Sequence, residues 1–253
     1  MSELPTITQV TIARLQGAKF AINSPEEGFL FSSFLLENHY MSYSQRFQDL
    51  WVLYETGSLR DGTFVDFGAG DGRNSSNSYL LQQKFGWGGI LVEPNVDYDD
   101  NLRHHVTDKV HVATGICVSD KDEDSVDFVA SFDPSLSTLH YTLDSDSHGM
   151  TRRALKSEVR KIPSVTLAKL IGDVKADYLS IDTEGSEYDI LHQYFVNDVG
   201  NPFTLITVEH NYNVTARRKL FDLLSDYGYI RRFPYYSGHD DWYILGNKCK
   251  DFR

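Results

Sequence analysis

The sequence predicts an α/β protein with a mainly parallel β-sheet and helices on both of its faces. Short apolar segments of strand length alternate with segments whose apolar residues recur at helical spacing, along most of the 253 residues. Apolar residues make up 41% of the chain and aromatic residues 13%, which supplies a sizeable core and excludes disorder along most of its length. Polar or glycine-rich residues follow several predicted strands directly, and ligands of parallel sheets bind at such carboxyl ends.

The predicted strands are short and rich in β-branched and aromatic residues, which favour extended structure. Those of the main sheet cover residues 63–67, 90–92, 110–118, 178–181, 205–208, 229–233 and 242–245. Residues 124–142 contain further residues of this kind and predict an inserted β-hairpin.

The predicted helices have an apolar face and, at several ends, a capping residue or a glycine. The first has Ser44 as its N-cap and ends at Gly57, and the second is capped within residues 74–76 and runs through Phe85. Four later helices cover residues 151–161, 166–171, 186–195 and 215–227. Because helices connect most consecutive strands, the sheet is expected to be mainly parallel.

We expect two parts in the chain: a lead-in segment over residues 1–43 and one large domain over residues 44–253. No run of about 18 uncharged apolar residues is present, which predicts no membrane-spanning helix and no membrane partner. The first 30 residues show no secretory signal, and the two cysteines, Cys117 and Cys249, are too few for a disulfide scaffold. These observations predict a cytoplasmic location.

The charge balance argues against nucleic acid as a partner. The formal net charge is −12 and the pI is about 5.1, whereas affinity for nucleic acid comes mostly from Lys and Arg side chains that neutralise phosphates. The local basic clusters, within residues 152–161, 217–219 and 231–232, alternate with acidic or apolar residues. We interpret them as solvated faces of helices or strands.

A glycine-rich loop, GAGDG at residues 68–72, follows the first strand and predicts a cofactor site. Its glycines allow positive φ and a close approach of a ligand to the backbone, and Glu93, 21 residues after Gly72, ends the next strand where an acid can accept both ribose hydroxyls. Dinucleotide sites usually show G-x-G-x-x-G, but Arg73 occupies the place of the last glycine. This departure favours S-adenosylmethionine (SAM) over a nicotinamide dinucleotide.

Two later strand ends carry candidate catalytic groups. Asp182 and Glu184 follow the strand at 178–181, where they could hold the cofactor ammonium, orient an acceptor or act as a general base; Glu184 could equally cap the next helix. Glu209 and His210 follow the strand at 205–208, and His210 is either a base or a structural histidine. We predict no metal; a site formed by Asp182, Glu209 and His210 is the weaker alternative.

Several strings together resemble the FkbM family of SAM-dependent methyltransferases. They are SQRFQD at 44–49, FVDFGAGDG at 64–72, GWGGILVEPN at 86–95, DYLSIDTEGSE at 177–187 and VEHN at 208–211. The resemblance covers roughly residues 42–245 and implies a Rossmann-like class I methyltransferase fold with an antiparallel strand near its C-terminal edge.

The resemblance also implies the positions of the cofactor. Glycines of the loop would lie against the methionine portion of SAM, Ser75 and Ser76 near its carboxylate, Glu93 on the ribose, and Ser119 and Asp120 near the adenine. The full set of implied cofactor-binding residues is Asp66, Gly68, Ala69, Gly70, Ser75, Ser76, Glu93, Pro94, Ser119, Asp120 and Asp182, and the catalytic candidates are Asp182, Glu184 and His210.

Family members mostly methylate hydroxyl groups, which implies a hydroxyl acceptor on a small molecule, sugar or glycan. Methylation of a nitrogen on a peptide or amino sugar is the alternative. A nicotinamide-dependent oxidoreductase and a non-catalytic SAM-fold binding protein are further alternatives, which the departure at Arg73 and the intact carboxylate sets disfavour.

Overall fold

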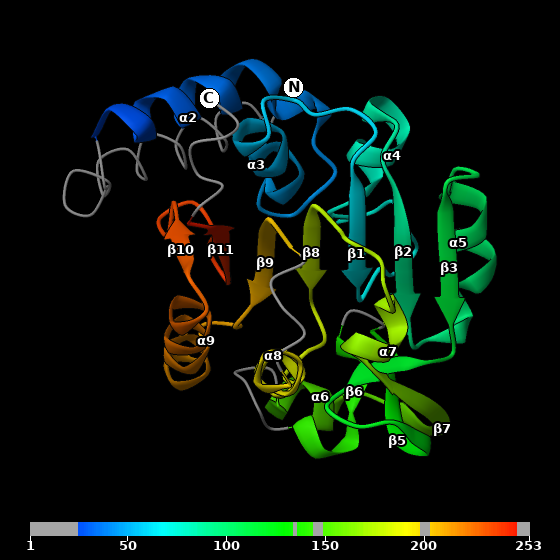
Figure 1. The fold of residues 1–253 in the computed structure, drawn as a ribbon. Helices are drawn as coiled ribbons and strands as arrows, with labels where there is room; N and C mark the ends of the chain where they lie inside the picture. Colours follow the sequence, from blue (N-terminus) through cyan, green and yellow to red (C-terminus); the bar gives the residue numbers. More distant parts are fainter. Residues whose placement is uncertain (1–24, 134–135, 144–148, 198–202, 247–253) are drawn as a thin grey trace.

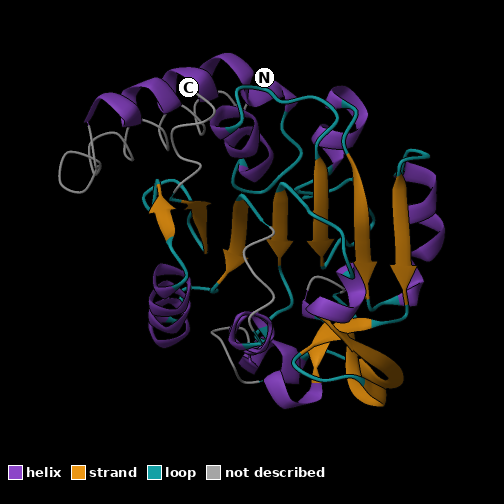
Figure 2. Ribbon diagram, viewed as in Figure 1, coloured by secondary structure: helices purple, strands orange, loops and turns teal. Residues whose placement is uncertain are grey.

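A seven-stranded sheet forms the centre of the molecule. The computed structural model describes residues 25–133, 136–143, 149–197 and 203–246. The strand order in this sheet is β10-β11-β9-β8-β1-β2-β3, and Figures 1 and 2 show these strands side by side. Their bounds are β1 Thr63–Phe67, β2 Gly88–Glu93, β3 Val110–Thr114, β8 Tyr178–Ile181, β9 Leu205–Glu209, β10 Tyr229–Arg232 and β11 Asp240–Leu245.

The order of the strands determines where a ligand can bind. β1 pairs in parallel with β2 on one side and with β8 on the other. The chain adds strands on one side of β1 first, as β2 and β3, and later on its other side, as β8 and β9, so the strand order reverses at β1. Ligands of such sheets lie at this switch point, outside the carboxyl ends of the strands. β11 is antiparallel to both of its neighbours, which confirms the antiparallel strand expected near the C-terminal edge.

Helices cover both faces of the sheet, each with its own apolar core. Side chains of α2 Pro25–Asn38, α3 Gln48–Glu55, α4 Tyr79–Phe85 and α5 Asp99–His105 bury one face, around Trp51, Trp87 and Trp242. Side chains of α7 Leu167–Ile171, α8 Glu187–Val196 and α9 Val214–Asp226 bury the other. The predicted α/β class, with a mainly parallel sheet between helices, is confirmed.

Two predicted elements are wrong because part of each belongs to a second sheet. The strand predicted over residues 110–118 is two strands, β3 and β4 Cys117–Ser119, because Gly115 at φ +67° turns the chain between them. The helix predicted over residues 151–161 ends early, as α6 Gly149–Ala154, and residues 157–161 belong to β7 Ser157–Thr166. Residues 157–161 pair with β5 as an antiparallel strand, and this long-range pairing overrides their local helix propensity.

These segments build a second, four-stranded sheet with the order β4-β7-β5-β6. β5 Glu123–Ser131 and β6 Thr138–Leu139 form the antiparallel pair expected for the insertion, although residues 134–135 of the predicted hairpin lie outside the described residues. Figure 1 shows this sheet and α6 below the carboxyl ends of β1, β2 and β8. The insertion is therefore placed to form a wall of any site at that edge.

The described part of the lead-in segment packs into the main core. Phe31 of α2 is fully buried, stacks on Phe233 at a ring distance of 4.4 Å and meets the edge of Trp242 at 6.0 Å. The domain boundary at residues 43/44 stays a prediction. Among the described residues, no helix is long and apolar enough to cross a membrane, and the cytoplasmic location also stays a prediction.

Candidate functional site

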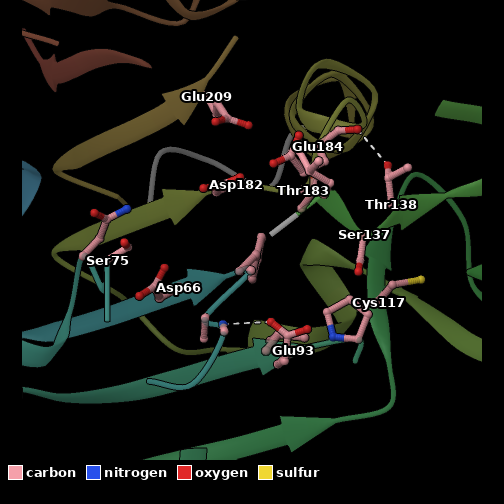
Figure 3. A pocket seen from close by; sticks show the side chains of 18 of the residues that line it. Asp66, Ser75, Glu93, Cys117, Ser137, Thr138, Asp182, Thr183, Glu184 and Glu209 are labelled. Atoms are coloured by element: carbon pink, nitrogen blue, oxygen red, sulfur yellow. Dashed lines mark hydrogen bonds between the residues drawn. The ribbon is translucent and has the colours of Figure 1, made fainter. Parts of the chain in front are cut away.

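A cavity of about 630 Å³ opens at the carboxyl ends of the central strands, within the size range of small-molecule sites. In the sheet register Phe67, Val92, Ile181 and Val208 lie side by side. The residue after each of these positions lines the cavity: Gly68, Glu93, Asp182 and Glu209. The cavity therefore combines the glycine loop with both predicted carboxylate strand ends, and Figure 3 shows Asp182, Glu184 and Glu209 at those ends.

Gly68 brings the backbones of β1 and β8 into close contact. Its φ is +76°, and a Cβ at this position would lie 1.9 Å from the carbonyl oxygen of Asp182. The N–H groups of Gly68 and Ala69 both donate to the Val92 carbonyl, at 3.0 and 3.3 Å. Gly70 has φ +56°, and no atom lies within 4 Å of a Cβ built there, so its exposed face leaves room for a ligand.

Glu93 holds the glycine loop from the end of β2. One of its carboxylate oxygens accepts the Gly70 N–H at 2.8 Å, and the other accepts the Asn95 N–H at 2.8 Å. Burial raises the pKa of Glu93 to about 7, although the two hydrogen bonds lower it. The charges of Asp182 and Asp66 add smaller increases. A carboxyl group with this pKa is partly ionised at neutral pH and can accept hydroxyl donors.

Asp66 anchors the segment after the loop. Its carboxylate accepts the Ser78 hydroxyl at 2.6 Å, while the Ser76 hydroxyl accepts the N–H of Tyr79 at 3.1 Å and so caps the first turn of α4. Burial raises the pKa of Asp66 to about 6. Ser75, at φ +58°, and Ser76 both line the cavity.

Asp182 and Glu209 form a carboxyl pair. Their side chains project into the cavity from neighbouring strand ends (Figure 3), and a carboxylate oxygen of each lies within 4.8 Å of the other. Burial raises the pKa of Asp182 to about 7, and burial together with the Asp182 charge raises the pKa of Glu209 well above its usual range. Two buried carboxyl groups this close together are not both ionised at neutral pH, so the pair retains one proton.

Glu184 is engaged by a buried cation. Arg152 of α6, with 1% of its side chain exposed, forms an ion pair with the Glu184 carboxylate, and the Asn211 amide donates to the same carboxylate oxygen at 3.0 Å. The Asn211 amide also donates to Glu209 at 2.8 Å. The interpretation of the 152–161 cluster as a solvated face is therefore wrong for Arg152.

The structure does not bring His210 to the cavity. One ring nitrogen, Nε2, lies 3.1 Å from the Asp240 carbonyl, and the other, Nδ1, lies 3.1 Å from the Tyr212 N–H. A carbonyl accepts and an N–H donates, so Nε2 carries the proton and Nδ1 is the acceptor. Burial also lowers the pKa of His210. The ring is therefore neutral, and both of its nitrogens are hydrogen-bonded to backbone groups.

Ser119 and Asp120 also lie outside the cavity lining. The Ser119 hydroxyl bonds the Asp120 carboxylate at 3.2 Å, and Asp120 lies 3.7 Å from the Lys121 ammonium. The apolar wall near Glu93 is formed instead by Cys117, Val118, Phe128, Leu136 and Leu139.

Sequence reasoning missed two groups near the carboxyl pair. His239 lines the cavity, and Asp240, buried and bonded to the Gln48 amide, has a pKa raised to about 8 by burial and by the Asp182 charge. Asp240 is the first residue of β11, and His239 directly precedes it. Because β11 is antiparallel, its first residues lie beside Glu209 at the carboxyl edge, which the predicted antiparallel strand could have indicated.

Two groups of side chains in the described part of the chain have the atoms of a metal site. One ligand atom from each of Asp182, Glu184 and Glu209, and likewise from Glu209, His239 and Asp240, lies within 4.8 Å of the others. His210 belongs to neither group. The proton that the carboxyl pair retains and the Arg152 charge offset part of the negative charge of the first group.

Comparison with known proteins identifies the family. The family model "Methyltransferase FkbM domain" matches residues 66–231, more than half of the chain. No curated protein matches the chain.

Solved structures that resemble it include precorrin-6Y C5,15-methyltransferase from Geobacter metallireducens, at 14% identity and TM-score 0.40, covering 73% of this chain and 72% of that one. A human methyltransferase 10 domain containing protein has 12% identity and TM-score 0.39, covering 78% of each chain. A mutant of MtNAS in complex with SAM has 14% identity and TM-score 0.38, covering 93% of this chain and 71% of that one. The chain belongs to the FkbM methyltransferase family and is a SAM-dependent methyltransferase.

Proposed function

We propose that the cavity holds SAM across the ends of β1 and β2 and that the enzyme methylates a hydroxyl group of a small molecule, sugar or glycan. In this arrangement Glu93 accepts the ribose hydroxyls, and the methionine portion follows Gly68–Gly70 towards Ser75 and Ser76. The apolar wall around Cys117 and Phe128 suits a purine ring better than the polar Ser119 and Asp120.

The charge of the cavity supports this donor. Its described lining contains six carboxyl side chains and no Lys or Arg, at Asp66, Asp71, Glu93, Asp182, Glu184 and Glu209. SAM carries a sulfonium and an ammonium, so negative potential favours it, and the methyl transfer itself removes the sulfonium charge. The same negative potential disfavours the pyrophosphate of a nicotinamide dinucleotide.

The Asp182–Glu209 pair is the observation that carries the proposal for the acceptor. An alcohol must lose its proton as the methyl group arrives, and a general base works best when its pKa lies near the operating pH. Asp182, with a pKa of about 7, meets this requirement, because the proton that the pair retains can reside on Glu209. Glu184 and His210 are both occupied by other partners, which leaves the role of base to Asp182.

We propose a second task for the same groups, which is the alignment of donor and acceptor. Transfer from a sulfonium is an in-line displacement, so donor and acceptor must be held a few ångströms apart, a contribution worth up to ~7–11 kcal/mol. Asn211 fixes both Glu184 and Glu209, and the acceptor side of the cavity is completed by Tyr212 and His239.

Methylation of an amine is the alternative, because an acidic cavity also attracts a protonated amine. A neutral amine needs no base to react, whereas a hydroxyl does. The two acceptors are therefore distinguished by their dependence on Asp182.

The test compares Asp182→Asn with Asp222→Asn, a control on the exposed face of α9. Transfer of labelled methyl groups from SAM is measured on methyl glycosides and on the matching amino sugars, with SAM affinity measured by calorimetry. We expect Asp182→Asn to lower turnover on the hydroxyl acceptor ~10²–10⁴-fold, with Asp222→Asn like the wild type. Turnover on amines alone, unchanged by Asp182→Asn, would reject the hydroxyl acceptor and the base together.

A further inference from the structure

The backbone at Glu184 has a conformation that needs outside support. Its φ is +60°, in the left-handed region that residues other than glycine and asparagine rarely adopt. Residues in such conformations persist where their surroundings determine them, and they concentrate at functional sites. Glu184 follows Asp182 by two residues, so it lies close to the carboxyl pair.

The support comes from the insertion rather than from the main sheet alone. The Thr138 hydroxyl of β6 donates to the Glu184 carbonyl at 2.7 Å, as the dashed line in Figure 3 shows, and Arg152 of α6 pairs with the Glu184 carboxylate. Arg152 also donates to the carbonyls of Leu136 at 3.1 Å and Leu143 at 3.5 Å. One buried guanidinium therefore joins Glu184 to the chain at both ends of the described segment 136–143.

Segment 136–143 forms part of the cavity wall. Leu136, Ser137, Thr138 and Leu139 line the cavity together with Cys117, and Figure 3 shows Ser137 and Thr138 in this wall, with Thr138 pointing towards Glu184. A ligand held in the cavity contacts this wall, and Thr138 and Arg152 join the wall to Glu184.

We propose that Arg152 is a positioning residue for one wall of the SAM cavity: through Glu184 it holds segment 136–143 against the end of β8 and so controls how fast SAM leaves. The proposal uses the donor position proposed above but does not depend on the acceptor or on the base. Glu184 then acts as the anchor of a wall instead of as a proton acceptor.

The experiment measures the release of radiolabelled SAM from the full-length protein after a chase with excess S-adenosylhomocysteine. Arg152→Met removes the charge and the donors while keeping apolar bulk, and Arg153→Met, at the exposed neighbouring position, is the matched control. We expect Arg152→Met to accelerate SAM release at least about tenfold, because the variant loses a buried ion pair. Arg153→Met should release SAM at the wild-type rate.

Two further variants keep the test decisive if Arg152→Met folds poorly. Thr138→Val keeps the shape of the side chain and removes its hydrogen bonds to the Glu184 carbonyl and the Thr142 hydroxyl, so we expect release to accelerate about threefold to tenfold. Glu184→Gln should accelerate release in the wild type but add little to Arg152→Met, because both substitutions break the same pair.

A purely structural role would lower the melting temperature and leave the release rate of the folded protein unchanged. Release within twofold of the wild type in both Arg152→Met and Thr138→Val would overturn the proposal. Equal acceleration by Arg153→Met, or fully additive effects of the two substitutions at the ion pair, would overturn it as well.

Discussion

Replacing Gly68 by alanine should disrupt both the fold and the binding of SAM. The added Cβ would lie 1.9 Å from the carbonyl oxygen of Asp182 and 3.1 Å from its carbonyl carbon. These atoms belong to the backbone, so no side-chain rotation relieves the clash, and the ends of β1 and β8 must separate. Separation displaces Asp182 and the glycine loop together.

The magnitude follows from two separate costs. The left-handed conformation at φ +76° costs a non-glycine residue roughly 1–2 kcal/mol, and overpacking against fixed atoms typically adds roughly 1–3 kcal/mol. Gly228→Ala is the matched control, because Gly228 has φ +84° and no atom within 4 Å of a Cβ built there. It should lose only the first contribution and keep its affinity for SAM.

Urea denaturation measures the free energies of unfolding, and calorimetric titration measures the SAM affinity of each variant. We expect a loss of roughly 2–5 kcal/mol for Gly68→Ala, with SAM binding weakened at least about tenfold. Equal losses of stability in the two variants, with SAM affinity retained in both, would refute the close approach of β1 and β8 as a requirement of the site.

Three further predictions concern stability. The unfolding free energy of the ligand-free protein should fall as the pH rises from about 4 to about 8 in urea denaturation, because burial raises the pKa of Glu93 to about 7 and of Asp240 to about 8, so the folded state binds more protons in this window; a rise would contradict these shifts. His210→Ala should lower stability by roughly 1–3 kcal/mol in the same assay while the folded protein keeps its turnover, since the ring bonds only backbone groups; loss of turnover without loss of stability would restore His210 as a base. Phe31→Ala should cost roughly 3–5 kcal/mol and Phe29→Ala, at a 65% exposed position, less than about 0.5 kcal/mol, which thermal unfolding tests; equal effects would mean that α2 does not pack on the core.

Local signals predicted the parts of the site that depend on one strand and the turn after it. The glycine loop, Glu93 and Asp182 each follow a short buried strand, and a parallel sheet gathers such ends at one edge. Their positions required no knowledge of the distant chain. The same reasoning placed the central strands close to their observed bounds.

Long-range pairing limited the rest. Residues 157–161 are charged and locally compatible with a helix, yet they pair with β5, and Arg152 is buried because the insertion folds back onto Glu184. His210 follows a strand end like Asp182, but the first residues of β11 turn its ring towards backbone groups. In these cases the environment of the residue is created by a segment far away in the sequence.

A structure of the protein with bound S-adenosylhomocysteine tests the central claim most directly. The account predicts the ribose hydroxyls at the Glu93 carboxylate, the amino-acid portion along Gly68–Gly70, and the sulfur facing the Asp182–Glu209 pair. A nucleoside bound elsewhere, or one whose ribose contacts no carboxylate at the end of β2, would contradict it.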